Sequence, residues 1–173
     1  LAVLFNGRPL DLRNLSEKVP VIYECWYLGQ DAGTAVAEAV FGDLNPGGKL
    51  PMTIPRSVGH IPAYYNYKPS ARRGYLFDDA GPLYAFGYGL SYTQFTFSEP
   101  QLERDTIRGH ESTRVSVTVT NTGQRAGDEV VQMYIRDCVS SVTRPVKELK
   151  GFQRIRLAPG ESRVVQLDIT PEY

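Results

Sequence analysis

Apolar and polar residues follow one pattern in the first part of the chain and another in the last part. Residues 1–5 form a continuous apolar run and residues 21–26 a mainly apolar one, as in strands of a buried sheet. Apolar side chains between 32 and 40 recur at spacings of three and four, which predicts a helix with Asp31 as N-cap and Gly42 as a left-handed cap. With a short helix expected over 11–18, this order predicts a parallel sheet with right-handed crossovers.

From Phe95 onward the pattern has a period of two. Three valines alternate with Ser and Thr in 113–120, and similar alternation returns in 129–136 and 165–169. Turn-forming residues separate these segments at 121–123 and 158–161. Several short alternating strands with turns between them predict a β-sandwich, which begins near residues 98–100.

The segment between these two regions is rich in aromatic residues and glycine and has no period. Its aromatic clusters lie at 64–67, 75–77 and 84–92, and 50–55 ahead of it is expected to be extended, because its prolines cannot donate to a sheet ladder. Such a composition predicts a long ordered loop that covers another surface. Tyrosines could also stack on sugars, but we favour an inter-domain interface.

Charge and composition exclude some classes of function. Lys and Arg total 19 and so do Asp and Glu, so the basic excess of a nucleic-acid binder is missing. No apolar run reaches the roughly 18 residues of a membrane span, and the start of the chain does not resemble a secretion signal. The chain opens inside an apolar run rather than with Met, so we expect a fragment of a longer protein. Cys25 and Cys138 are expected to be buried free thiols.

Motifs for nucleophilic and metal chemistry are weak. The Gly-x-Ser-x-Gly pattern around Ser91 fails at Thr93. The two histidines, His60 and His110, lie in different segments, so a Ser/His/Asp triad is not expected. No cluster of His, Cys or carboxylates has the spacing of a zinc site, and no metal or cofactor is expected.

Two features could bind or transfer charge. Residues 29–33 open a helix and could hold an anion on free N–H groups, but Asp31 would repel phosphate, so we favour a tight turn in which Gly33 packs the helix close to the sheet. Glu24 ends a predicted strand beside Trp26, where burial would raise its pKa and suit a general acid. A structural glutamate satisfied by a partner is the favoured alternative.

Two other motifs have simpler explanations. Asp78 and Asp79 are adjacent, so in an extended loop they point apart and are expected to form a turn rather than a glycosidase pair. Asn14-Leu15-Ser16 matches the glycosylation sequon, which has meaning only in a eukaryotic secretory route.

An ordered series of short motifs nevertheless resembles glycoside hydrolase family 3, in the form of bacterial β-glucosidases that carry a fibronectin type III-like tail. The series covers nearly the whole chain, and its segments are 6–10, 26–33, 41–51, 86–93, 127–134, 144–152 and 157–161.

The resemblance implies a multi-domain fold, α/β followed by all-β. Residues 1–60 would be the C-terminal part of an α/β sandwich domain, 61–97 a connecting loop, and 98–173 an immunoglobulin-like, fibronectin type III-like domain that lacks its last strand. The parent would be a retaining exo-β-glycosidase that releases terminal β-D-glucosyl residues from oligosaccharides or aryl glycosides. A β-xylosidase of the same family is an alternative, and so is a carbohydrate-binding or adhesion module without catalysis.

The resemblance assigns no catalytic residue to this chain. The family's nucleophile, an Asp in an N-terminal barrel domain, and its acid/base, a Glu of the sandwich domain, would both lie upstream of Leu1. The substrate would bind through that missing barrel, against which this chain would pack. Nucleic acid and membrane are not expected as partners, a homodimer is left open, and a periplasmic or secreted location fits the family.

Overall fold

The computed structural model describes residues 1–69 and 79–172, which form two compact units. The α/β unit comprises the described residues of Leu1–Leu44, Leu50–Tyr88 and Ser140–Val146. The β-sandwich unit comprises those of Asn45–Lys49, Gly89–Val139 and Lys147–Tyr173.

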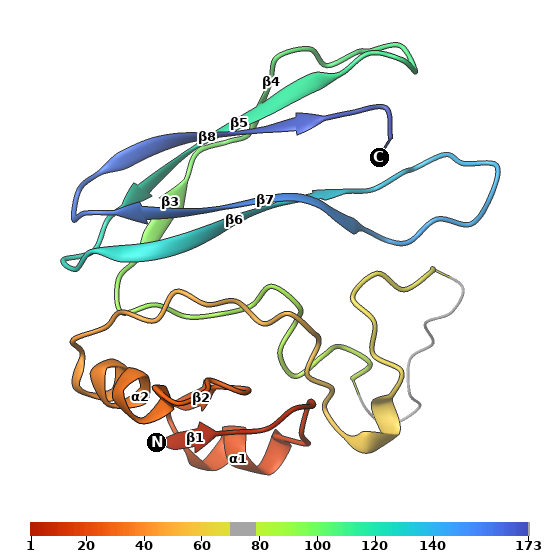
Figure 1. Cartoon of the computed structure of the whole chain (residues 1–173). Coiled ribbons are helices and arrows are strands. Elements are labelled where there is room, and N and C mark those ends of the chain that lie inside the picture. The colour runs from red at the N-terminus through yellow and green to blue at the C-terminus, as the bar shows by residue number, and fades with distance from the viewer. Residues whose placement is uncertain (70–78, 173) are drawn as a thin grey trace. The chain divides into compact units, whose positions relative to one another are not determined.

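The α/β unit contains the parallel strand pair that the sequence predicts (Figure 1). β1 (Ala2–Leu4) pairs with β2 (Ile22–Glu24), and Leu4 lies opposite Glu24. The expected second strand stops at Glu24 rather than residue 26, because the backbone of Trp26 turns into the left-handed region at φ 49°. The 11–18 helix forms over α1 (Arg13–Lys18), and α2 spans Ala32–Phe41.

The ends of α2 agree with the prediction in all but one respect. Gly42 caps α2 at φ 85°, in the left-handed conformation that glycine adopts without steric cost. Asp31 occupies the N-cap position, but its side chain makes no capping hydrogen bond. Its main-chain oxygen accepts from the N–H of Ala35 at 3.0 Å, as the first helical hydrogen bond.

The aromatic segment is paired rather than a free-standing loop. After the 3-10 turn η1 (Val58–His60), the chain returns so that Tyr84 and Tyr88 lie beside Ile54 and Leu50. The N–H of Ile54 donates to the Tyr84 carbonyl at 2.9 Å, and that of Leu50 to the Tyr88 carbonyl at 2.8 Å. Aromatic rings also stack in this paired segment: the ring centroids of Tyr65 and Phe86 are 4.1 Å apart, and those of Tyr84 and Tyr88 are 5.5 Å apart. The cluster 75–77 lies outside the described residues.

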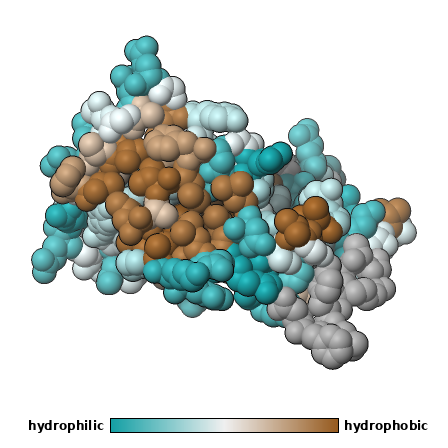
Figure 2. All heavy atoms as spheres, turned by 90° about the horizontal axis from the view of Figure 1, so that it is seen from below, coloured by the Kyte–Doolittle hydropathy of each residue, from teal (hydrophilic) through white to brown (hydrophobic). Residues whose placement is uncertain are grey.

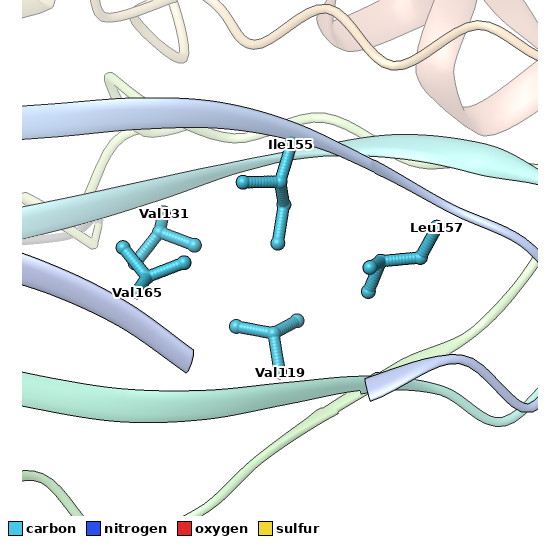
Figure 3. Packing of buried hydrophobic residues seen from close by; sticks show 5 residues of the cluster. All are labelled: Val119, Val131, Ile155, Leu157 and Val165. Atoms are coloured by element: carbon cyan, nitrogen blue, oxygen red, sulfur yellow. The ribbon is translucent and has the colours of Figure 1, made fainter. Parts of the chain in front are cut away.

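The β-sandwich unit confirms the period-two pattern. One layer holds β3 (Phe95–Phe97), β4 (Gln101–Leu102), β5 (Thr113–Asn121) and β8 (Ser162–Ile169), and the other holds β6 (Gly127–Ile135) and β7 (Glu148–Leu157). Figure 3 shows that five apolar side chains from both layers meet between them: Val119, Val131, Ile155, Leu157 and Val165.

A fully buried asparagine closes one end of this core. The Asn121 side-chain oxygen accepts from the Thr93 hydroxyl at 2.7 Å and from the N–H of Gly123 at 3.1 Å. Its amide donates to the carbonyls of Arg125 and Leu157, at 2.7 and 3.1 Å. Every hydrogen-bonding position of the amide group is therefore used, which is what allows a polar side chain to be buried here.

A second polar cluster, which we call the clasp, ties residues 45–49 to the sandwich. The Lys49 ammonium lies 2.9 Å from Glu129 Oε1 and donates to the Gly89 carbonyl at 2.9 Å. The Lys49 and Glu129 side chains are only 16% and 10% exposed. Asn45 accepts from the N–H of Tyr92 at 2.7 Å and donates to the Ala126 carbonyl at 3.0 Å.

Glycine allows the clasp to close. A Cβ on Gly89 would lie 2.2 Å from the Gly48 carbonyl oxygen, and one on Gly47 would lie 2.7 Å from that of Asp128. Both obstacles are backbone atoms, so a larger residue would push the segments apart. The Asn-Pro-Gly-Gly-Lys motif is therefore a structural part of the sandwich unit, although it directly follows the α/β segment in sequence.

Truncating the core should destabilise the sandwich unit. We expect Leu157→Ala to lower its free energy of unfolding by about 2–5 kcal/mol, because a fully buried side chain leaves a cavity. The only tryptophan, Trp26, lies in the α/β unit, so hydrogen exchange of β5 and β6 amides in urea is the suitable measurement. Val139→Ala, at a side chain 92% exposed, is the control and should stay within about 0.5 kcal/mol of the parent. Equal effects would contradict the assigned core.

Removing the Lys49 ammonium from the clasp should lower the free energy of unfolding more than removing a surface charge does. Lys49→Met leaves the Glu129 carboxylate shielded and without its cation. We therefore expect the free energy of unfolding of the sandwich unit to fall by about 3 kcal/mol, measured by the same hydrogen exchange. Lys49→Met/Glu129→Gln should recover roughly half of this loss, because the uncompensated charge is gone. Arg163→Met, which removes an exposed pair with Glu161, should lower the free energy of unfolding far less than Lys49→Met does. A double variant as unstable as Lys49→Met would rule out the charge as the cause.

Candidate functional site

The carboxyl ends of β1 and β2 bring Asn6 and Glu24 together in the α/β unit. Ligands of open α/β sheets gather at such strand ends, which makes this the first place to look for chemistry. The two strand ends stay in register beyond the strands, because the N–H of Cys25 donates to the Leu4 carbonyl at 2.9 Å. The loops that follow are packed closely: a Cβ on Gly7 would lie 2.3 Å from the Tyr27 hydroxyl oxygen.

Glu24 lacks the partner that a structural glutamate requires. Both of its carboxylate oxygens are shielded from solvent, and neither has a hydrogen-bond partner in the described part of the chain. Burial raises the pKa of the Glu24 carboxyl, while the nearby Trp26 N–H and Asn6 side chain lower it in part. The Asn6 amide nitrogen instead donates to the Arg8 carbonyl at 2.7 Å. The favoured expectation, a carboxylate satisfied within the fold, does not hold for these residues.

The same geometry limits what Glu24 can do. A general acid must reach the oxygen that it protonates, within hydrogen-bond distance or through one water. The Glu24 oxygens are covered in this conformation. No second carboxylate is among the groups that shift its pKa, whereas glycosidases use two carboxylates that flank one bond. Of the catalytic requirements Glu24 therefore meets only one, a raised pKa.

The loop at 29–33 is a tight turn, but for a different reason from the one expected. Gly29 adopts φ 77°, where other residues are strained, and its carbonyl accepts from the N–H of Ala32 at 3.3 Å. Among the described residues outside its own helix backbone, a Cβ on Gly33 would meet no atom within 4 Å. The expectation that Gly33 packs the helix against the sheet was therefore wrong.

The remaining candidates fall at separate places. Asp79 accepts from the N–H of Gly81 at 2.7 Å and pairs with Arg56 at 2.8 Å, as a turn former does; Asp78 lies outside the described residues. His60 ends η1 in the α/β unit, whereas His110 belongs to the sandwich unit. Across residues 1–69 and 79–172, no group of three or more His, Cys, Asp or Glu could hold a metal ion.

The cysteines and the sequon are also separate from any site. Cys25 and Cys138 are both free, as expected, but neither is buried: Cys25 is half-buried, and Cys138 is exposed because it follows β6 in a surface loop. Burial raises the pKa of the Cys25 thiol, and the charge of Glu24 adds to this. Asn14 and Ser16 lie in α1, where the Ser16 hydroxyl already donates to the Arg13 carbonyl at 2.8 Å. No helix in the described residues has the length and apolar character to cross a bilayer.

Sequence reasoning missed one further feature, a polar hollow on the outer face of the β3-β5-β4 sheet. It has a volume of about 360 Å³ and is lined by Gln101, Leu102, Glu103, Arg114, Ser116 and Gln166. These residues come from or adjoin β4, β5 and β8. Except for Leu102, they form the polar half of an alternating pattern in the sequence, which is indistinguishable from an ordinary solvated face.

Comparison with known proteins assigns both regions. Residues 1–92 match the glycosyl hydrolase family 3 C-terminal domain, and residues 129–173 match the fibronectin type III-like domain. A "Beta-xylosidase" of Formosa agariphila is 50% identical over 98% of the chain, and a "Periplasmic beta-glucosidase" of Salmonella typhimurium is 48% identical over 98%. The chain spans 24% of the length of each of these relatives.

Solved structures agree with the sequence matches. A β-glucosidase from Erythrobacter marinus superposes with a TM-score of 0.96 at 53% identity, over 98% of this chain and 23% of the other. A β-glucosidase from Listeria innocua in complex with glucose gives 0.92 at 38% identity, over 98% and 25%. The family's C-terminal α/β region is thus followed by a fibronectin type III-like β-sandwich, as the sequence indicated. The chain belongs to glycosyl hydrolase family 3.

Proposed function

We propose that this chain is the non-catalytic C-terminal portion of a retaining, exo-acting β-glycosidase that hydrolyses terminal β-D-glucosyl residues. The observation that supports this most directly is coverage: the chain aligns almost completely with enzymes of which it is only 24%. The same view fits Glu24, because no second carboxylate of the described residues is among the groups that shift its pKa. Residues 1–60, 61–97 and 98–173 would be the end of the sandwich domain, the connecting segment and the fibronectin type III-like domain.

The chemistry would then take place on parts of the protein outside this chain. A carboxylate nucleophile attacks the anomeric carbon while a second carboxyl group protonates the departing oxygen, which forms a glycosyl-enzyme. The second group then removes a proton from water, and the hydroxide displaces the enzyme carboxylate to give product with retained configuration. An Asp nucleophile and a Glu acid/base upstream of Leu1 would fill these roles, and no residue of this chain takes part.

An exposed apolar face of the α/β unit supports the proposal that this unit is part of a larger domain. Figure 2 shows apolar side chains gathered on the face of the molecule seen from below. Several large apolar residues of this unit are exposed, among them Leu1, Phe5 and Phe41. Parallel strands are almost always covered on both faces, so a sheet of β1 and β2 alone is incomplete. Further strands and helices of a family 3 sandwich domain would supply the cover.

Glucose is proposed as the sugar because β-glucosidases are among the relatives and superposed structures. The relatives include a β-xylosidase and a β-glucosidase at 50% and 48% identity, and these values do not separate the two activities. Listeria innocua β-glucosidase was solved with glucose and, as a variant, with laminaribiose. A β-xylosidase is therefore the second candidate, and the ratio of kcat/KM for aryl β-D-glucoside to that for aryl β-D-xyloside decides between them.

Activity should be absent from this chain and insensitive to Glu24. We expect the purified 173-residue chain to release no aglycone from aryl β-glucoside above background, whereas the longer enzyme turns it over. Glu24→Gln in the longer enzyme should leave kcat within about threefold, since loss of a general acid costs roughly 10²–10⁴-fold. Asn14→Gln, on the exposed side of α1, is the control for handling of variants. Turnover by the chain alone, or a hundredfold loss in Glu24→Gln, would overturn the proposal.

Glu24 should instead affect stability, in a direction set by its pKa. Because the folded pKa is raised above the ordinary 4.5, the folded state binds the proton more tightly than the unfolded state. The free energy of unfolding of the α/β unit should therefore fall as the pH rises from the ordinary pKa of 4.5 towards the raised pKa of the folded state. Glu24→Gln should flatten that slope and stabilise the unit at neutral pH. Trp26 fluorescence during urea unfolding at several pH values measures this; a variant less stable than the parent at pH 7 would show that the carboxylate has a stabilising partner.

A further inference from the structure

The polar hollow is built from two rows of side chains that cross three strands. In the first row, Ser116 of β5 lies opposite Gln101 of β4 on one side and Gln166 of β8 on the other. In the second row, Arg114 lies opposite Asp168, and the N–H of Glu103 donates to the Arg114 carbonyl at 2.8 Å. Residues opposite each other in a sheet share a face, so these polar groups all project outward together.

The hollow has both a fixed part and uncommitted hydrogen-bonding groups. Arg114 Nε donates to Asp168 Oδ1 at 2.7 Å, which fixes one edge of the guanidinium group beside Asp168. The two terminal nitrogens of Arg114 make no hydrogen bond within the described part of the chain, and the same is true of the Gln101 and Gln166 side-chain amides. The Ser116 hydroxyl has only a long contact, 3.4 Å, to the Gln101 carbonyl.

The combination of groups selects a ligand class. Guanidinium and amide N–H groups donate, while amide and carboxylate oxygens accept, and a ligand that must satisfy both in alternation is one rich in hydroxyls. In the lining Glu103 balances Arg114, and Asp168, which adjoins the hollow, pairs with the same guanidinium, so no net positive charge favours an anionic ligand. Beside the first row, the Val164 side chain is 58% exposed on the same outer face and offers an apolar contact to sugar C–H groups. The volume of about 360 Å³ suits one or two sugar rings.

We propose that this hollow on β4, β5 and β8 is a non-catalytic binding site for neutral β-linked oligosaccharides. The site is separate from the proposed hydrolysis, since it lies on the fibronectin type III-like unit of this chain. It has no aromatic platform, so its dissociation constant should be on the order of millimolar. Such a site would hold polymeric substrate near the enzyme rather than bind one chain end tightly.

The direct test is a titration of the ¹⁵N-labelled 173-residue chain with cellopentaose and with xylopentaose. We expect saturable amide shifts at Gln101, Ser116 and Gln166 with either neutral sugar. Pentagalacturonate, which is anionic, should shift them at least about tenfold less at equal concentration, because like charges repel. Absence of saturable shifts up to the solubility limit, or shifts confined to β6 and β7, would overturn the proposal.

Variants identify the groups that bind. Arg114→Ala should weaken binding roughly tenfold, because it removes charged donors to sugar hydroxyls. The matched control is Arg163→Ala, because Arg163 is equally exposed, at 46%, and pairs with Glu161 at 2.8 Å outside the hollow. Equal weakening by both variants would refute the site. The amide spectrum of each variant reports its folding, and Gln166→Ala replaces Arg114→Ala if the latter unfolds.

The longer enzyme provides an independent measurement. In native gels that contain soluble mixed-linkage β-glucan, the parent and Arg163→Ala should be retarded, and Gln166→Ala should be retarded less. The amide shifts and the gel retardation measure binding and not hydrolysis, so they separate this proposal from the proposed function. A protein that binds glucan and hydrolyses no glycoside would contradict the function alone, and an active enzyme that is not retarded would contradict this inference alone.

Discussion

The β-sandwich unit depends on a shielded ion pair between Lys49 and Glu129. Lys49 comes from a segment that follows α2, while Glu129 lies in β6, so the pair joins residues 80 positions apart. Such a pair repays its desolvation only if the remaining hydrogen-bonding capacity is satisfied. Here the ammonium also binds the Gly89 carbonyl, and the carboxylate accepts from the Val130 N–H at 2.9 Å. Three segments that are distant in sequence are thereby held in one place.

The two units are stabilised in different ways. The sandwich has an apolar core between two layers, closed at one end by a fully satisfied asparagine. The α/β unit has two short parallel strands, a shielded carboxyl group without a partner and several exposed apolar side chains. Unsatisfied polar atoms and bare parallel strands both indicate contacts that these residues do not make among themselves. This asymmetry is why we place catalysis elsewhere in the protein and confine this chain to support and weak sugar contact.

Local patterns predicted the elements well, because periodicity and turn residues act over a few positions. The parallel order of β1 and β2, the α2 cap at Gly42 and the alternating strands of the sandwich all followed from them. The pairing of Leu50 and Ile54 with Tyr88 and Tyr84 did not follow from them. These partners lie 38 and 30 residues apart in the sequence, and the prolines and aromatics between them give no periodic signal. The segment that contains Asn45 and Lys49 was interpreted as a simple turn, because its contacts are also with residues far away in the sequence. The polar hollow could not be found at all, since only strand register places Gln101, Ser116 and Gln166 in one row.

The central claim, that glycosidic bonds are cleaved by groups outside these 173 residues, can be tested by covalent labelling. A 2-deoxy-2-fluoro-β-glucosyl fluoride should trap the glycosyl-enzyme of the longer protein, and peptide mapping then locates the ester. Our account predicts one labelled aspartate on a peptide outside this chain. A label on Glu24, or on any other carboxylate between Leu1 and Tyr173, would contradict it.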